Sequence, residues 1–159
     1  MSLFARNLMF TIVVPGTGAV LVPWWILSRN GVENSPKQWI ALVAIAAGAL
    51  LYLACVRVFA VVGRGTPGPW DAPRSLVLVG PYRWVRNPIY LAAITVVLGE
   101  SWLFLSTSLV VYAVVMAIFV NLWVIGYEEP HLRRRFGDSY REYLRTVRRW
   151  IPRRPRTGP

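Results

Sequence analysis

Apolar residues gather in four long stretches that are separated by polar, basic or proline-rich segments. The stretches cover 8–27, 39–62, 89–105 and 109–127. Each is close to the ~20 residues that an α-helix needs to cross the hydrocarbon core of a bilayer, so the pattern predicts four transmembrane helices. The third stretch is short and contains Glu100, so it is predicted either to cross fully or to form a tilted or re-entrant piece.

The composition fits a membrane protein whose ends are basic. The chain has 159 residues, the usual size of one domain, and we expect a single domain over 1–159. It is 55% hydrophobic yet carries a formal net charge of +11, a combination that is rare in water-soluble proteins. Most charges lie outside the apolar stretches. The predicted fold class is therefore an all-α integral membrane protein with about four transmembrane helices.

The arginines predict the orientation of the helices. With four crossings, the N-terminus, the loop over 63–87 and the tail over 128–159 share one side of the membrane. That side carries Arg6, four arginines of the loop and ten arginines of the tail, whereas the opposite side has only Arg29 and Lys37. Cytoplasmic segments of membrane proteins are enriched in arginine and lysine, so both termini are predicted to be cytoplasmic.

The cytoplasmic segments contain three further predicted features. Residues 128–147 place apolar side chains at helical spacing with arginines on the other faces, which predicts an amphipathic interfacial helix. Gly137 is expected to break this helix, and Ser139 with Glu142 has the spacing of a capping box that would restart it. The loop over 63–73 is too rich in glycine and proline to be helical, and the Pro/Arg-rich end of the chain is expected to be disordered.

Two polar clusters flank the hairpin formed by the third and fourth stretches. The first, 80–90, contains several arginines, and the second, 127–143, opens with Glu128 and Glu129. Because a hairpin returns to the side it left, the arginines of the first cluster and the carboxylates of the second can meet at one membrane surface. That meeting point is the predicted active site.

The arginines of the first cluster have two interpretations. Juxtamembrane arginines commonly bind lipid phosphates and could form a simple anchor. However, Asn87 followed by Pro88 indicates a helix start, with asparagine at the N-cap and proline in the first turn. Free backbone N–H groups at that start, together with Arg83 and Arg86, would suit an anionic group such as a carboxylate.

The paired acids of the second cluster indicate a binding site more strongly. Two adjacent acids at the end of a span are costly if they are buried and unpaired. Neighbouring residues on a helix point about 100° apart, so Glu128 and Glu129 rarely serve one purpose. One could pair with arginine while the other accepts hydrogen bonds from ribose hydroxyls or an ammonium group. A solvated helix end with salt bridges to Arg133 or to the loop arginines is the alternative interpretation.

Other polar residues are less informative. Glu100 is either a functional intramembrane acid or a loop residue on the far side, and the sequence leaves both open. Cys55 stands alone in the sequence, so disulfides and thiolate metal sites are excluded, and no metal site is expected. His131 is expected at the surface, and Asn121 could make a hydrogen bond between helices.

Together these residues resemble a known superfamily. The sequence is similar to the isoprenylcysteine carboxyl methyltransferases and phospholipid N-methyltransferases. The similarity lies in the motif Gly-Pro-Tyr-Arg-Trp-Val-Arg-Asn-Pro-Ile-Tyr, the apolar hairpin after it, and the motifs Tyr-Glu-Glu-Pro-His-Leu-Arg-Arg-Arg-Phe-Gly and Val-Arg-Arg-Trp-Ile-Pro. The resemblance covers roughly 79–152. It implies a membrane enzyme that uses S-adenosyl-L-methionine without a Rossmann domain, binds it at the cytoplasmic face, and takes a lipid-like substrate from the bilayer.

The resemblance implies roles for Arg86, Asn87, Pro88 and Tyr90 in its first motif and for Glu128 and Glu129 in its second. Tyr82, Arg83 and Glu100 are added as candidates from their positions in the sequence. The candidate cofactor-binding residues are Tyr82, Arg83, Arg86, Asn87, Pro88, Tyr90, Glu128 and Glu129. The candidate catalytic residues are Arg86, Glu129 and Glu100. Arg86 and the helix start would hold the cofactor's carboxylate, Glu128 or Glu129 would hold its ribose or ammonium, and Tyr90 would pack on it. If the acceptor is an amine, one of the three glutamates would take its proton.

The acceptor stays open at this point. Asn87 stands where the prenylcysteine enzymes usually have histidine. The Asn-Pro pair at this position resembles the phospholipid enzymes and many bacterial members of the superfamily. The expected function is an S-adenosylmethionine-dependent methyltransferase with a lipid-like acceptor, isoprenylcysteine carboxyl methyltransferase-like. The alternatives are a phospholipid ethanolamine N-methyltransferase and a non-enzymatic protein that binds anionic lipid. The related sterol reductases use NADPH but are much longer.

The resemblance and the charge pattern together also predict the location and the partners of the protein. The bacterial inner membrane is the expected location, with the lipid bilayer and a lipid-like small molecule as partners. No nucleic-acid partner is expected. The oligomeric state is not predicted, because the spans lack a decisive small-residue motif.

Overall fold

The computed structural model describes residues 3–30, 38–63 and 76–152, and in these ranges every regular element is helical. The all-α prediction is therefore confirmed. Most of the predicted loop over 63–73 and the end of the chain after 152 lie outside the described residues. The elements are α1 (Leu3–Val13), η1 (Thr17–Leu21), α2 (Val22–Arg29), α3 (Ala41–Val58), η2 (Phe59–Gly63), η4 (Gly80–Arg83), α4 (Pro88–Leu103), α5 (Thr107–Trp123), η5 (Val124–Glu128) and α6 (Glu129–Thr146).

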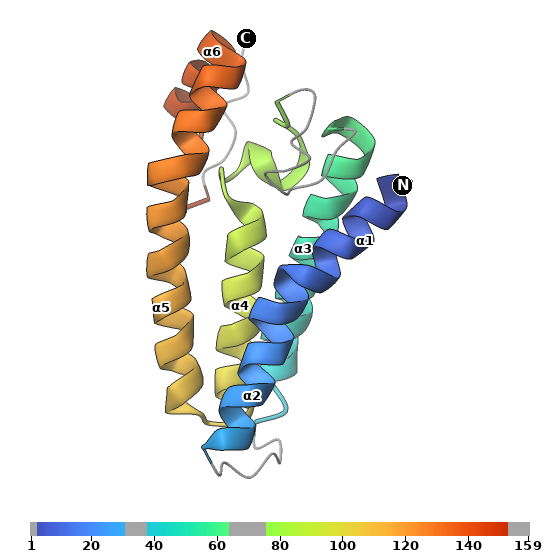
Figure 1. Ribbon diagram of the computed structural model, residues 1–159, viewed down its shortest axis with the longest axis vertical. Helices are drawn as coiled ribbons and strands as arrows, with labels where there is room; N and C mark the ends of the chain where they lie inside the picture. The colour runs from blue at the N-terminus through green and yellow to red at the C-terminus, as the bar shows by residue number, and fades with distance from the viewer. Residues whose placement is uncertain (1–2, 31–37, 64–75, 153–159) are drawn as a thin grey trace.

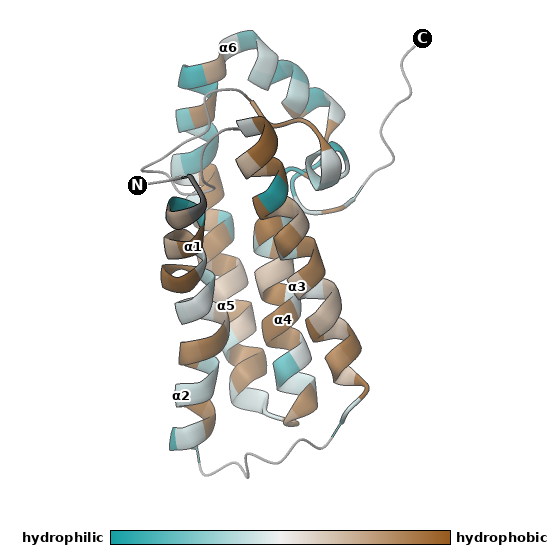
Figure 2. Cartoon of the chain, turned by 90° about the vertical axis from the view of Figure 1, so that its right-hand side faces the viewer, coloured by the Kyte–Doolittle hydropathy of each residue, from teal (hydrophilic) through white to brown (hydrophobic). Residues whose placement is uncertain are grey.

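The outer surface of the helix bundle is apolar, as a membrane protein requires. Large apolar side chains such as Val43 and Leu122 are exposed. Hydrophobic residues predominate along the helices of the bundle (Figure 2). Water-soluble proteins rarely expose large contiguous apolar surface. Among the described residues, the helical runs that are long and apolar enough to cross a membrane are Ala5–Arg29, Ala41–Gly63 and Thr107–Thr146. The chain is thus an integral membrane protein.

The weakest predicted span forms a continuous helix in the bundle. α4 has 16 residues, which corresponds to about 24 Å, and it passes through Glu100 without a break. It is shorter than the other three helical runs, but it lies lengthwise between α3 and α5 (Figure 1). The third apolar stretch is therefore a helix of the bundle and contains no re-entrant turn.

Small residues allow α3 and α4 to approach each other closely. A Cβ atom at Gly48 of α3 would lie 2.8 Å from the carbonyl oxygen of Ala92, and one at Gly99 of α4 would lie 2.7 Å from the side chain of Ile45. In a membrane, where lipid tails are as apolar as the helices, close packing at small residues is a main source of helix association. The two helices therefore form a rigid support for the polar segment that precedes α4.

Two π-helical turns allow long helices to continue past prolines. η1 lies just before Pro23, and η5 lies just before Pro130. Proline has no N–H to donate to the carbonyl four residues earlier, and a π-turn accommodates that loss. As a result, the predicted interfacial helix is present as α6 but continues from α5 instead of starting afresh at the membrane surface. Its predicted break is confirmed at Gly137, where φ is 53°.

The two polar clusters lie at the same end of the bundle. The N-terminus, the end of α3, the start of α4 and the whole of α6 meet at this end, while the turn between α4 and α5 lies at the other (Figure 1). Hydrophilic residues gather on α6 (Figure 2). We call this end, which carries Arg86, Arg133 and Arg149, the arginine-rich end. The hairpin argument from the sequence is confirmed.

Candidate active site

A buried carboxylate joins two arginines at the arginine-rich end. Arg86 Nη1 donates to Glu129 Oε1 at 2.9 Å, while Arg149 donates from Nε to Oε1 at 2.7 Å and from Nη2 to Oε2 at 3.1 Å. The side chains of Arg86 and Glu129 are 12% and 7% exposed, so the pair is shielded from water. The hydrogen bonds to Glu129 raise the pKa of Arg149 above its ordinary value. We call Arg86, Glu129 and Arg149 the buried triad because its central carboxylate is buried, although the side chain of Arg149 is 30% exposed.

The segment after α6 is attached to the start of α4. The backbone N–H of Arg86 donates to the carbonyl of Arg148 at 2.9 Å, and Asn87 Nδ2 donates to the carbonyl of Arg149 at 3.3 Å. Pro88 occupies the first turn of α4, as predicted. Asn87 occupies the N-cap position of α4, as predicted, but its side chain makes no capping hydrogen bond, and its buried amide instead donates to the returning chain.

The second carboxylate has a different partner. The hydroxyl of Tyr90 donates to Glu128 Oε2 at 2.8 Å. Glu129 thus pairs with arginines while the neighbouring Glu128 accepts from a neutral donor. This division confirms the argument that adjacent helical side chains, which point about 100° apart, serve separate purposes. Glu128 is the carboxylate that faces α4.

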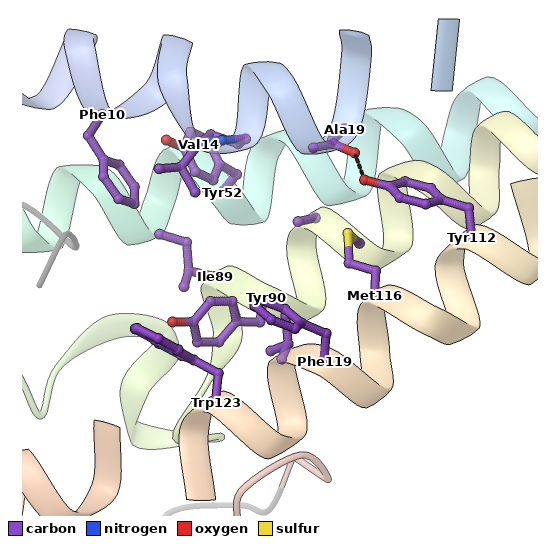
Figure 3. Close-up of a pocket in the computed structure, with 14 residues that line it drawn as sticks. Phe10, Val14, Ala19, Tyr52, Ile89, Tyr90, Tyr112, Met116, Phe119 and Trp123 are labelled. Carbon is purple, nitrogen blue, oxygen red and sulfur yellow. Dashed lines mark hydrogen bonds between the residues drawn. The ribbon is translucent and has the colours of Figure 1, made fainter. Parts of the chain in front are cut away.

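A cavity of about 440 Å³ lies within the bundle, and Tyr90, the partner of Glu128, is one of its lining residues. Its lining comes from the N-terminal helical run, α3, α4 and α5 (Figure 3). Ile89, Tyr90 and Trp123 line the end near Glu128, while Gly18 and Tyr112 line the far end. The volume is within the range of about 300–1,000 Å³ that is typical of small-molecule sites.

The interior of this cavity is apolar because its tyrosine hydroxyls are engaged elsewhere. Tyr90 bonds Glu128, Tyr112 donates to the carbonyl of Gly18 at 2.7 Å, and Tyr52 shares a hydrogen bond of 2.8 Å with Thr11. The rest of the lining is mainly apolar and aromatic. Phe119, one of the lining side chains, is also 64% exposed, so the cavity wall reaches the outer apolar surface of the bundle.

Comparison with known proteins identifies the family of this chain. Residues 36–139, well over half of the chain, match the sequence profile of the phospholipid methyltransferases. The chain belongs to the phospholipid methyltransferase family. It is also similar to an uncharacterized protein of Haemophilus influenzae, with 40% identity over 64 residues, which make up 40% of this chain and the whole of that relative.

The family match covers most of the helices that form the site. It spans α3, α4, α5 and the first half of α6, and so includes both polar clusters. The N-terminal helical run, which supplies one wall of the cavity, and Arg149 of the buried triad lie outside it. Membership in this family implies a membrane methyltransferase.

Three predicted site residues do not join this cluster. Tyr82 is buried in an apolar group with Cys55 and Val77, and Arg83 is exposed. Glu100 lies twelve residues after Pro88 on α4, which is about 18 Å along the helix toward the opposite end. One buried oxygen of Glu100 has no hydrogen-bond partner in the described part of the chain. Glu100 is therefore remote from the buried triad and from Glu128.

Two residues that the structure brings to the site received no role from the sequence. Arg149 completes the buried triad, and Trp150 donates from its indole nitrogen to Asn121 Oδ1 at 2.9 Å, which ties the returning segment to α5. Asn121 thus bonds the C-terminal segment instead of a neighbouring transmembrane helix. The signal for both was the Val-Arg-Arg-Trp-Ile-Pro motif, whose position after an amphipathic helix allows it to fold back.

Proposed function

We propose that this chain is an S-adenosyl-L-methionine-dependent methyltransferase that acts on a lipid-like acceptor at the cytoplasmic face of a bacterial inner membrane. The observation that carries the proposal is the apolar cavity lined by Tyr90, whose hydroxyl donates to Glu128, the sequence neighbour of Glu129 in the buried triad. A charged cofactor and the head group of an amphiphile could meet at the end of the cavity near Tyr90. The arginine content of this end supports its cytoplasmic assignment.

The chemistry of the residues at this end fits S-adenosylmethionine. The cofactor carries a sulfonium, an ammonium and a carboxylate. A carboxylate at Glu128 and the aromatic faces of Tyr90 and Trp123 suit its cations. Arg86 suits its anion, since the buried Arg86 Nε has no hydrogen-bond partner within the described residues.

These contacts allow a more specific assignment than the sequence did. We assign Arg86 to the carboxylate of the cofactor. We assign Glu128, and not Glu129, to its ammonium or ribose, because both oxygens of Glu129 already accept from arginines. Glu129 then acts as a positioning residue that holds Arg86 in place.

The proposed reaction is a methyl transfer in which the chain mainly binds, orients and excludes water. When bound, S-adenosylmethionine supplies a methyl group that its sulfonium charge already activates. The buried triad fixes the start of α4 against α6, and the Tyr90–Glu128 hydrogen bond fixes the mouth of the cavity. Holding reactants in one geometry can supply a large part of a rate enhancement. The apolar lining would keep water from the reacting atoms.

Whether the methyl acceptor is an oxygen or a nitrogen determines whether the reaction needs a general base. A lipid carboxylate, the acceptor type of the isoprenylcysteine carboxyl methyltransferases, needs no base. A lipid amine, the acceptor type of the phospholipid ethanolamine N-methyltransferases, must lose a proton, and Glu128, which is bonded to the cavity-lining Tyr90, is suited to accept it. The presence of this carboxylate and the family match favour the amine.

Transfer of a radiolabelled methyl group into a lipid extract tests this function. Purified protein is incubated with labelled S-adenosylmethionine and total membrane lipid, and the extracted lipid is then treated with mild alkali. Label that survives alkali indicates an N-methyl product, and label released as methanol indicates a methyl ester. Absence of label above that of a boiled control would refute the proposal.

The non-enzymatic interpretation predicts a different pattern. If Arg86 served only to bind anionic lipid, exchange to lysine would be harmless and no cofactor would bind. For the methyltransferase, Arg86→Lys loses the planar two-donor geometry that a carboxylate needs, and lysine does not replace it. The comparison of Arg86→Lys with the wild-type protein therefore separates the two interpretations: a methyltransferase shows methyl transfer that the variant loses, whereas a lipid-binding protein shows no methyl transfer in either form.

A further inference from the structure

The far end of the cavity is closed by one hydrogen bond. Tyr112 on α5 donates from its hydroxyl to the carbonyl of Gly18 in η1 at 2.7 Å (Figure 3). Within the described chain, the lining on α5 begins at Tyr112, and the lining on the N-terminal run ends at Ala19. The contact therefore lies at the boundary of the cavity that is most distant from Glu128.

The sequence around Gly18 explains why tyrosine is needed at this point. In η1 the N–H of Val22 donates to the carbonyl of Thr17, five residues earlier. In the same register the carbonyl of Gly18 would accept from residue 23, but that residue is Pro23, which has no N–H. An unpaired carbonyl is costly within the hydrocarbon region, and the hydroxyl of Tyr112 satisfies it.

The depth of the cavity follows from its lining on α5. Trp123 lies at the end near Tyr90 and Tyr112 at the far end, eleven residues apart (Figure 3). At a rise of about 1.5 Å per residue this separation is about 16 Å. A straight alkyl chain whose head group sits at the Tyr90–Glu128 contact would run along α5 and meet the ring of Tyr112.

We propose that Tyr112 is a specificity-determining residue that, together with Gly18, forms the floor of the cavity and limits the length of the acceptor's alkyl chain. The position of the head group in this inference rests on the proposed function, whereas the floor itself does not require methyl transfer. The hydrogen bond holds the tyrosine ring across the cavity, in contrast to the neighbouring lining residue Met116, whose flexible side chain can adapt.

Two substitutions should move this limit in opposite directions. Tyr112→Ala removes the ring and extends the cavity beyond its present end. Gly18→Leu adds bulk at the floor, because a Cβ atom at Gly18 would lie 3.8 Å from Tyr112 Oη, with no closer neighbour. Trp102→Ala is the control, since Trp102 is an exposed aromatic residue of α4 that does not line the cavity.

Photolabelling measures the limit without requiring catalysis. The full-length protein in lipid nanodiscs is exposed to single-chain alkyl phosphoethanolamines of increasing length, each with a diazirine at the chain terminus, and the labelled residues are located by mass spectrometry. In the wild-type protein the labelled position should move from Trp123 toward Tyr112 as the chain lengthens. Past the limit, overfilling should lower labelling of the lining by about 5-fold or more.

The variants decide the outcome. Tyr112→Ala should accept chains that the wild-type protein excludes, Gly18→Leu should exclude chains that the wild-type protein accepts, and the Trp102→Ala limit should equal that of the wild type. The same limit in all four proteins, or labelling only on the outer face of the bundle, would overturn the proposal. Labelling as expected without methyl transfer in the same preparations would count against the proposed function and not against the floor.

Discussion

Removing the charge of Glu129 should destabilise the whole arginine-rich end. In a Glu129→Gln variant, a neutral amide replaces the carboxylate that lies 2.9 Å from Arg86 Nη1 and 2.7 Å from Arg149 Nε. Arg149 is 30% exposed and can turn toward water, but Arg86 is 12% exposed and cannot do so without opening the structure. Leaving one member of a buried ion pair uncompensated costs typically ~3–5 kcal/mol. Because glutamine can still accept one hydrogen bond, we expect the lower end, about 3 kcal/mol.

Unfolding of the purified protein in mixed micelles measures this loss. The protein is titrated with a denaturing detergent, and tryptophan fluorescence gives the free energy of unfolding. Glu142→Gln is a matched control, because Glu142 is also on α6 but is 68% exposed, and its nearest recorded arginine contact is 4.0 Å long. Exposed ion pairs contribute little, so the free energy of unfolding of the control should change by less than about 1 kcal/mol.

A double variant tests whether the loss of stability comes from the uncompensated charge of Arg86. Replacing both charges in an Arg86→Met, Glu129→Leu double variant removes the uncompensated charge and should recover part of the stability that the single variant loses. The reasoning fails if Glu129→Gln is as stable as the Glu142→Gln control. It also fails if the double variant is less stable than the sum of the two single losses predicts.

Three further predictions concern helix packing, the C-terminal segment and the mouth of the cavity. Gly48→Leu directs a side chain at the carbonyl of Ala92 and should yield no monodisperse protein in size-exclusion chromatography, whereas a normal elution profile would contradict the close α3–α4 packing. Trp150→Phe loses the hydrogen bond to Asn121 and should lower the free energy of unfolding by about 1 kcal/mol in the same titration. An unchanged free energy of unfolding would contradict a stabilising role for this hydrogen bond. Tyr90→Phe removes the donor to Glu128 and should weaken S-adenosylmethionine binding about tenfold by calorimetry; equal affinity would exclude a role for this contact.

The helices and their common end could be predicted from the sequence. Uninterrupted apolar stretches of bilayer length leave few alternatives to helices, because every backbone group must be paired within the membrane. A hairpin between two polar clusters then fixes that Arg86 and Glu129 lie on one side. The positions of Gly137 and Pro88 followed from local backbone preferences.

The partners within the site depended on tertiary structure. Asn87 is a residue type that favours N-caps, and it occupies that position. Its side-chain amide, however, donates to the carbonyl of Arg149 in the returning chain, which no local pattern predicts. Arg149 is one of many arginines in the tail, and no local pattern distinguishes the one that reaches Glu129. The distance of Glu100 from the site followed only once α4 was known to be unbroken. The cavity itself arises between four helical runs and has no signature in any one of them.

The central claim is that the end of the cavity at Tyr90 and Glu128, beside the buried triad, binds S-adenosylmethionine. Calorimetric titration of the purified protein with S-adenosylmethionine tests it most directly, with Glu128→Gln and the exposed-site variant Glu142→Gln measured in parallel. We predict saturable one-site binding by the wild-type protein and by Glu142→Gln, and an affinity at least about tenfold weaker for Glu128→Gln. No binding by the wild-type protein, or equal affinity in all three proteins, would contradict the claim.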